Sequence, residues 1–237
     1  SPSHGVSALL GNAGFKGGTV QVSDVVFKIA PRINAAGRMD HANVGVKLLR
    51  AQSESEAAEL AEMIEKLNIS RKERDTITTE EALEQMLSFD PDLKRSTTIV
   101  AKKSWHKGLV GIVASRLMET SYRPTIVLTE NDGVLSGSAR STSAFNLHEA
   151  LTACSEHLEK YGGHAAAAGL TLKRENLESF KADFEAYAQK VLGTERIYPT
   201  IEIALDVSFE DWHNKDYQHF YIQLNRFRPY GPENLPP

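Results

Sequence analysis

The sequence predicts an α/β fold in which a compact domain with a mixed β-sheet is joined by a long helix to a small N-terminal lobe. Short β-branched runs alternate with amphipathic helical patterns between residues 97 and 191, which is typical of a compact α/β domain. No glycine or proline interrupts residues 46–90, so a long helix is expected there. Apolar residues recur with period two over 201–209, which indicates the first strand of a further β-rich domain.

The composition is typical of a globular protein. Of the 237 residues, 41% are hydrophobic and 24% are charged, and the net charge of −4 argues against a uniformly basic nucleic-acid binder. The single cysteine, Cys154, permits no internal disulfide, and no apolar run approaches the ~18 residues of a membrane helix. We therefore expect a cytoplasmic protein that does not contact a membrane. Its abrupt start and turn-rich end predict a fragment of a longer chain.

The charges are segregated along the chain. Residues 54–90 hold eleven acidic residues against four Lys or Arg, whereas residues 94–123 hold seven Lys or Arg against Glu119 alone. This distribution predicts one solvated acidic helix and one basic face on the following domain.

The N-terminal segment predicts two helices, a strand and a loop. Helical patterns cover 6–10 and 42–51, and a β-branched stretch at 21–27 predicts a short strand. Residues 29–38 predict a loop, because Pro31 restrains its predecessor to an extended conformation and Gly37 permits a turn. The arginines of such a loop suit a phosphate or carboxylate, since arginine offers a planar fork of donors. The alternative is a surface turn with solvated arginines.

The long helix is expected over residues 54–87. Ser53 and Glu56 have the spacing of a capping box, and Leu60, Ile64 and Leu67 form an apolar stripe. Residues 71–75 are polar on every side, which is typical of a helix that crosses solvent between two bodies. The alternative is two helices broken near residues 76–79, because threonine is a poor helix former.

The region after Pro91 predicts alternating strands and helices. Strands are expected at 97–101, 124–129, 133–139 and 166–172, and helices at 108–119, 143–160 and 175–191. Asn131, Asp132 and Gly133 have the composition of a hairpin turn between the second and third strands. The continuous apolar run at 124–129 indicates a strand that is buried on both faces.

The stretch 160–169 contains Gly162, Gly163 and His164, followed by four alanines and a glycine. Adjacent glycines allow a backbone turn whose N–H groups hold an anion, and a histidine adds a further donor. The alternative is a helix C-cap followed by a tightly packed strand of small residues.

Four segments, in this order, resemble the RecJ family of single-strand-specific DNA exonucleases within the DHH phosphoesterase superfamily. They are residues 29–38 (IAPRINAAGR), 105–117 (WHKGLVGIVASRL), 136–140 (SGSAR) and 162–169 (GGHAAAAG). The resemblance implies four regions: residues 1–50 as the end of a DHH domain, 51–92 as the interdomain helix, 93–195 as a DHHA1 nucleic-acid-binding domain, and 196–237 as the start of an OB-like barrel. Residues 231–234 follow the family pattern near the barrel only loosely.

The metal motifs of the family are not found in this sequence. It has no Asp-His-His motif, and its histidines show no ligand spacing with nearby carboxylates. The resemblance therefore implies Mn²⁺ or Mg²⁺ in the full-length enzyme, whereas we expect no metal, no catalytic residue and no activity in this fragment alone.

The resemblance also implies a set of residues that bind nucleic-acid phosphates. Ser138 and Arg140 would form a pocket for the 5′ phosphate, with Arg38 beside them. The remaining candidates are Arg32 and Asn34 near Arg38, Gly162, Gly163 and His164 as a phosphate cradle, and His106, Lys107 and Arg116 along a channel. Two alternatives remain open, namely that Arg32 anchors its own segment and that His106 caps the following helix.

Three functions compete at this point. The first is the strand-binding half of a 5′-to-3′ single-stranded-DNA exonuclease of DNA repair and recombination, whose implied partners are single-stranded DNA and a single-strand-binding protein or helicase. The second is a phosphodiesterase for short oligoribonucleotides or cyclic dinucleotides. The third is a non-enzymatic scaffold. The long helix and the strand at 201–209 favour the first function.

Overall fold

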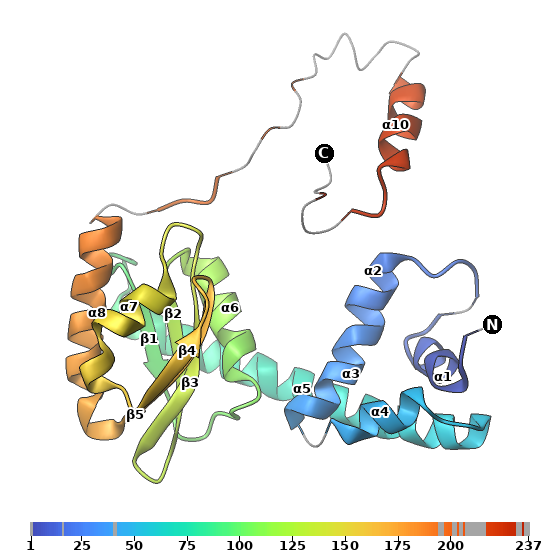
Figure 1. Cartoon of the computed structure of the whole chain (residues 1–237), viewed down its shortest axis with the longest axis horizontal. Helices are drawn as coiled ribbons and strands as arrows, with labels where there is room; N and C mark the ends of the chain where they lie inside the picture. Colours follow the sequence, from blue (N-terminus) through green and yellow to red (C-terminus); the bar gives the residue numbers. More distant parts are fainter. Residues whose placement is uncertain are drawn as a thin grey trace. The chain divides into compact units, whose positions relative to one another are not determined.

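The computed structural model describes residues 2–15, 17–39, 42–193, 197–200, 203, 206, 217–230 and 234 (Figure 1). The chain divides into two units, residues 1–198 and 199–237, and each is described here by itself. No helix in the described part of the chain is long and apolar enough to cross a membrane.

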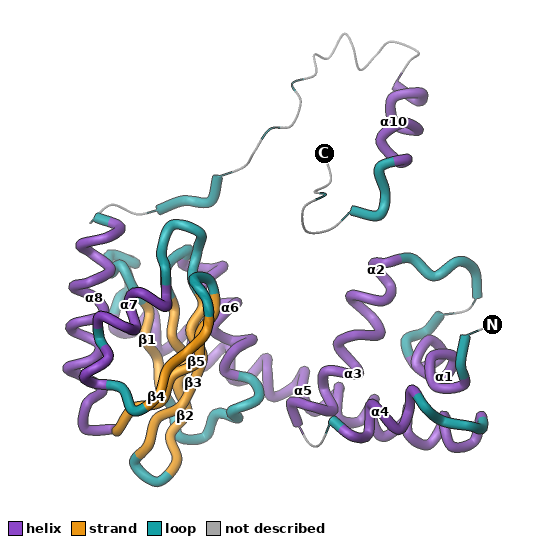
Figure 2. The backbone as a smooth tube through the Cα atoms, viewed as in Figure 1, coloured by secondary structure: helices purple, strands orange, loops and turns teal. Residues whose placement is uncertain are grey.

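The first unit contains a five-stranded mixed sheet in the order β1-β2-β3-β5-β4 (Figure 2). The strands are β1 (Thr98–Ala101), β2 (Thr125–Asn131), β3 (Val134–Arg140), β4 (Lys160–Gly163) and β5 (Ala167–Lys173). Only β1 and β2 are parallel, and the other neighbours are antiparallel. The β2–β3 turn places Asp132 and Gly133 at φ angles of 48° and 77°, as the sequence predicts for a tight hairpin.

Helices cover the two faces of this sheet, so the predicted mixed α/β fold is confirmed (Figure 1). Helix α6 (Val110–Ser121) and the end of α5 (Glu54–Phe89) share a core with Val100 and Val127. Helices α7 (Leu147–Ala153) and α8 (Leu177–Leu192) cover the opposite face, where Phe180 and Phe184 share a core with Leu135 and Leu170. The short helix η3 (Arg174–Asn176) connects β5 to α8.

Helix α5 is continuous over 36 residues, and the alternative of two helices is therefore wrong. The Ser53 hydroxyl accepts a hydrogen bond from the Glu56 N–H at 3.2 Å, and the Glu56 carboxylate accepts one from the Gln52 N–H at 3.0 Å. The beginning of α5 packs into the N-terminal lobe through Ala57, Ala61 and Ile64, and its end packs into the α/β domain through Ala82 and Met86. The helix therefore has one apolar anchor at each end.

The N-terminal lobe is helical. It comprises α1 (His4–Asn12), α2 (Val22–Asp24), the π-helix η1 (Val25–Ile29), α3 (Ala30–Met39) and α4 (Asn43–Leu49). The strand predicted at 21–27 is wrong, because local bonds favour a helix there. The Asp24 carboxylate accepts from the Gln21 N–H at 2.9 Å and from the Lys28 ammonium at 2.7 Å.

The loop predicted at 29–38 is also wrong, because these residues form the end of η1 and most of α3. The Ala30 N–H donates to the Val25 carbonyl five residues earlier. This wider turn accommodates Pro31, which has no N–H to donate. Gly37 lies inside the helix rather than in a turn.

The single helix predicted at 143–160 is wrong as well. Asn146, not Ser143, caps α7, since its side-chain oxygen accepts from the N–H groups of His148 and Glu149. A 3₁₀ turn, η2 (Ser155–His157), follows, and the chain then forms β4 at the sheet edge. Pairing with β5 overrides the local helical preference.

The described part of the second unit contains α10 (Tyr217–Arg226). Most of the strand predicted at 201–209 lies outside the described residues. The OB-like start and the four domain boundaries therefore stay predictions.

Candidate phosphate-binding site

Arg140 and Ser138 face the first turn of α6. They are two residues apart on β3, so they point to the same face of the sheet. A Cβ atom placed on Gly111 would lie 3.1 Å from Arg140 Nη2 and 3.4 Å from Ser138 Oγ. A guanidinium, a hydroxyl and a helix N-terminus thus converge, and each of these groups favours an anion.

The Arg140 side chain bonds to its own strand rather than to an acidic residue of the described part of the chain. Its Nη1 donates to the Ala139 carbonyl at 2.7 Å, and no carboxylate in the described part of the chain pairs with it. The side chain is half-buried, and this burial, together with the nearby charge of Arg38, lowers the pKa of Arg140. An anion that bound here would supply the missing negative charge.

Arg38 approaches the same region from α3. Its Nη1 donates to the Gly108 carbonyl at 3.2 Å. A Cβ atom on Gly108 would lie only 2.2 Å from the Arg38 carbonyl oxygen, so this contact requires glycine. The N-terminal lobe and the loop before α6 therefore meet at the predicted phosphate site. Asn34 is exposed one helical turn before Arg38.

Two further arginines, Arg116 on α6 and Arg71 on α5, extend this group toward the middle of α5. Arg116 Nη2 on α6 lies 2.9 Å from Asp75 Oδ2 on α5, and Arg71 Nη1 lies 3.9 Å from the same oxygen. Burial lowers the pKa of Arg71, Asp75 counteracts this, and the charges of Arg38 and Arg116 lower it further. The four arginines therefore form one connected positive cluster. The sequence predicts that the middle of α5 crosses solvent. The structure differs, because the Asp75 side chain is buried there.

The basic face predicted at 94–123 is largely wrong. Most of its cations are paired with acidic residues: Lys94 with Asp92 at 2.8 Å, Lys102 with Glu81 at 2.8 Å, Arg116 with Asp75 at 2.9 Å and Arg123 with Asp90 at 2.6 Å. Arg123 is buried. Lys107 is exposed, with no ion pair among the described residues, and stays a candidate for contacting a strand.

Two other candidates have structural partners. Arg32 pairs with Glu65, at 2.5 Å from Nε and 3.3 Å from Nη2, and this favours the interpretation that Arg32 anchors its own segment. His106 Nδ1 accepts from the Gly108 N–H at 3.1 Å, which favours the capping alternative.

Gly162 and Gly163 belong to strand β4, and His164 begins the turn to β5, so the glycines do not form the predicted free loop. Gly163 has a φ of 141°, and a Cβ atom there would lie 2.4 Å from the Ala167 carbonyl oxygen. The His164 N–H donates to that same carbonyl at 2.8 Å, so it is not free to hold an anion. Gly162 pairs with Gly169, and Gly169 pairs with Ser138. A row of small residues therefore runs from Ser138 to the sheet edge.

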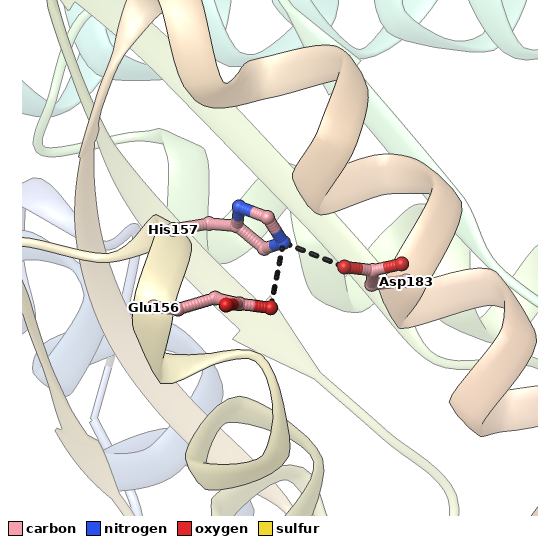
Figure 3. A group of neighbouring side chains, drawn as sticks. All are labelled: Glu156, His157 and Asp183. Carbon is pink, nitrogen blue, oxygen red and sulfur yellow. Dashed lines mark hydrogen bonds and ion pairs between the residues drawn. The ribbon is translucent and has the colours of Figure 1, made fainter.

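Glu156, His157 and Asp183 form a group that spacing along the sequence did not reveal (Figure 3). His157 Nε2 lies 2.6 Å from Asp183 Oδ2 and 3.7 Å from Glu156 Oε1. Since η2 and α8 carry these residues, they belong to the side of the sheet opposite α6. The group has three side chains, and two of them are exposed carboxylates, which is too few ligands for a paired-metal centre. It also lies on the other side of the sheet from Arg140, so it does not fit a centre that acts on a phosphate held there.

Comparisons with known proteins identify relatives of this chain. Residues 95–190 match the DHHA1 domain family. The chain is 37% identical over 235 residues to the single-stranded-DNA-specific exonuclease RecJ of Bacillus subtilis, which covers 98% of this chain and 29% of that protein. It is 37% identical over 187 residues to RecJ of Escherichia coli, covering 76% of this chain and 32% of that protein.

Solved structures agree with these matches. RecJ from Thermus thermophilus in complex with Mg²⁺ superposes with a TM-score of 0.82 at 28% identity, covering 99% of this chain and 35% of that chain. An exonuclease RecJ bound to manganese gives a TM-score of 0.70 at 32% identity, covering 79% of this chain and 46% of that chain. The chain thus spans about three tenths of the length of the curated relatives that it matches.

Proposed function

Because the chain is a RecJ-like segment that carries a DHHA1 domain, we propose that it is the strand-binding half of a 5′-to-3′ single-stranded-DNA exonuclease. The observation that carries this proposal is the half-buried guanidinium of Arg140, which lies beside Ser138 and the first turn of α6. No carboxylate among the residues that the structure describes pairs with it. A terminal phosphate matches this site, because its oxygens accept from guanidinium, hydroxyl and backbone N–H groups alike.

In this proposal, the arginine cluster orients the substrate. Arg140 and Ser138 hold the 5′ phosphate, and Arg38 holds it from the side of the N-terminal lobe. The row of small residues from Ser138 to Gly162 lets the strand lie close to the sheet. Arg116 and Lys107 contact phosphates further along the strand, with Asn34 and His164 at the margins of the site.

Hydrolysis of the phosphodiester is assigned to the part of the enzyme outside this chain. Divalent metal ions such as Mn²⁺ or Mg²⁺ would activate water and stabilise the developing charge there. The residues of this chain would fix the phosphate end, so that one scissile bond is presented at a time. We place this activity in DNA repair and recombination in the cytoplasm, with a single-strand-binding protein or a helicase as partner.

A titration of 5′-phosphorylated and 5′-hydroxyl oligonucleotides tests the proposal. The wild-type chain is expected to prefer the phosphorylated end, and Arg140→Ala to lose that preference selectively. Lys107→Ala should weaken both oligonucleotides alike, because a channel lysine contacts backbone charge wherever the strand lies. Arg174→Ala is the matched control, since it removes the same charge near the other end of β3, where the Arg174 N–H donates to the Gly133 carbonyl.

Two outcomes would overturn the proposal. One is a wild-type chain with no preference for a phosphorylated end, and the other is an Arg140→Ala variant that keeps it. Tighter binding of a cyclic dinucleotide, which has no terminal phosphate, would favour the small-substrate phosphodiesterase instead.

A further inference from the structure

Asp75 is the one carboxylate that pairs with any of the four clustered arginines among the residues that the structure describes. It lies near the middle of α5, and its side chain is 2% exposed. Its partner Arg116 is 47% exposed, so a fixed acid inside the protein holds an arginine that reaches solvent.

The surroundings of Asp75 are polar and only partly hydrogen-bonded. The Asn68 Oδ1 accepts from Arg71 Nη2 at 3.3 Å. Four other buried atoms have no hydrogen-bond partner among the described residues: Asn68 Nδ2, Arg71 Nε, Asp75 Oδ1 and Thr79 Oγ1. Such a network contributes little to stability, because a protein with apolar residues of similar shape in its place is often as stable or more stable. Its geometry is better explained by a role in holding the arginines.

We propose that Asp75 is a positioning residue for nucleic-acid binding, which holds Arg116 in the orientation that meets a strand phosphate. It acts through Arg116 and does not touch the strand. This inference rests on the proposed function and deepens it, because it assigns a task to the centre of the long helix.

The direction in which one substitution changes single-strand affinity distinguishes positioning from simple electrostatics. Asp75→Asn removes a negative charge beside a cluster that binds a polyanion, so electrostatics alone predicts tighter binding. Positioning predicts the opposite, because the released Arg116 no longer meets its phosphate at a fixed place. We expect single-strand affinity to fall about tenfold, the loss of roughly one charged hydrogen bond. We also expect the slope of log affinity against log salt to become shallower by about 0.7.

The experiment is a fluorescence titration of a 5′-phosphorylated single strand at two salt concentrations, alongside thermal unfolding of each variant. The variants are Asp75→Asn, Arg116→Ala and their combination. Adding Asp75→Asn to Arg116→Ala should not weaken binding further, since no arginine is left to be positioned. Glu62→Gln is the matched control, because it removes one charge from an exposed pair with Lys66 on the same helix. It should leave affinity within about twofold of wild type.

Arg116→Lys keeps the proposal testable if Asp75→Asn does not fold. Lysine keeps the charge but lacks the planar fork that the carboxylate holds, so affinity should fall as it does for Arg116→Ala. Tighter binding by Asp75→Asn, or a lowered unfolding temperature with the affinity of the folded protein unchanged, would overturn the inference alone. Failure of the wild-type chain to bind single strands would overturn the proposed function and this inference with it.

Discussion

Arg38 Nη1 donates to the carbonyl oxygen of Gly108 at 3.2 Å, across seventy positions of sequence. The contact is reciprocal, because the Cα of Gly108 lies against the Arg38 backbone carbonyl with no room for a side chain. A candidate phosphate ligand is therefore also part of the contact between the N-terminal lobe and the α/β domain. Strand binding and lobe packing depend on the same residue.

Substitution of Gly108 tests this contact. In Gly108→Ala the new Cβ would lie 2.2 Å from the Arg38 carbonyl oxygen, so the lobe must move away from α6. We expect a drop of several degrees in the unfolding temperature and a weakened preference for a 5′-phosphorylated strand, since Arg38 moves with its backbone. Gly11→Ala in α1 is the control, because no atom lies within 4 Å of its new Cβ. Unchanged stability and binding in Gly108→Ala would contradict this prediction.

Gly111→Ala should act on the site without harming the fold. Alanine favours a helix over glycine by about 1 kcal/mol, so stability should stay level or rise. The added methyl group would lie 3.1 Å from Arg140 Nη2 and 3.4 Å from Ser138 Oγ, which narrows the space for a phosphate. Affinity for a 5′-phosphorylated strand should fall several-fold while a 5′-hydroxyl strand is little affected. Parallel titrations and melts measure both effects, and equal losses for both strands would contradict the assignment of this pocket.

Asp90 and Arg123 form a buried ion pair that should dominate acid sensitivity. Burial alone would raise the pKa of Asp90, but hydrogen bonds from Arg123 and from the Arg95 and Lys94 N–H groups outweigh it and hold the pKa below its ordinary value. The ionised folded form is thus favoured, so its contribution is present above about pH 4 and is lost as pH falls through the lowered folded pKa.

Asp90→Asn should therefore lower the free energy of unfolding by about 3–5 kcal/mol at neutral pH, because Arg123 is left buried without a counter-charge. The variant should also lose part of the pH dependence below about pH 4. Denaturant unfolding at several pH values measures both. Asp92→Asn is the control, since its pair with Lys94 is exposed and contributes about 0–1 kcal/mol.

Cys154 should be unreactive in the folded protein. Burial raises the pKa of its thiol to about 11, and the charges of Asp183 and Glu156 add to this shift. The thiolate is the reactive form, so alkylation at neutral pH should require unfolding. Iodoacetamide labelling followed by mass spectrometry, with and without denaturant, checks this. Rapid labelling of the native protein would show that the thiol is accessible.

Regular elements could be predicted from the sequence where local and tertiary preferences agree. The apolar stripe and the cap at Ser53 predict α5, and the turn at Asp132 and Gly133 predicts the β2–β3 hairpin. The errors fall where tertiary contacts decide. Residues 160–163 become a strand only because β5 offers an edge to pair with. Pro31 is accommodated in the first turn of α3, after the wide turn of η1.

The distribution of charge illustrates the same limit for the site. The acidic stretch and the following basic stretch predict one solvated helix and one basic face. In the structure they partly pair with each other, because α5 packs against the α/β domain and pairs Glu81 with Lys102 and Asp75 with Arg116. That no described carboxylate pairs with Arg140 could not be predicted from spacing, because pairing depends on which residues the fold brings together. Only the segment resemblance pointed to Arg140 and Ser138.

The two anchors of α5 impose a strict condition on its length. One inserted residue between Ile64 and Ala82 would rotate one anchor against the other by about 100° and shift it by about 1.5 Å. Seven inserted residues would nearly restore the angular phase but would separate the anchors by about 10 Å. Either change would take Arg38 out of reach of Gly108. Among related chains, insertions and deletions should therefore fall in the surface loops, while the residue count between these two anchors is held constant.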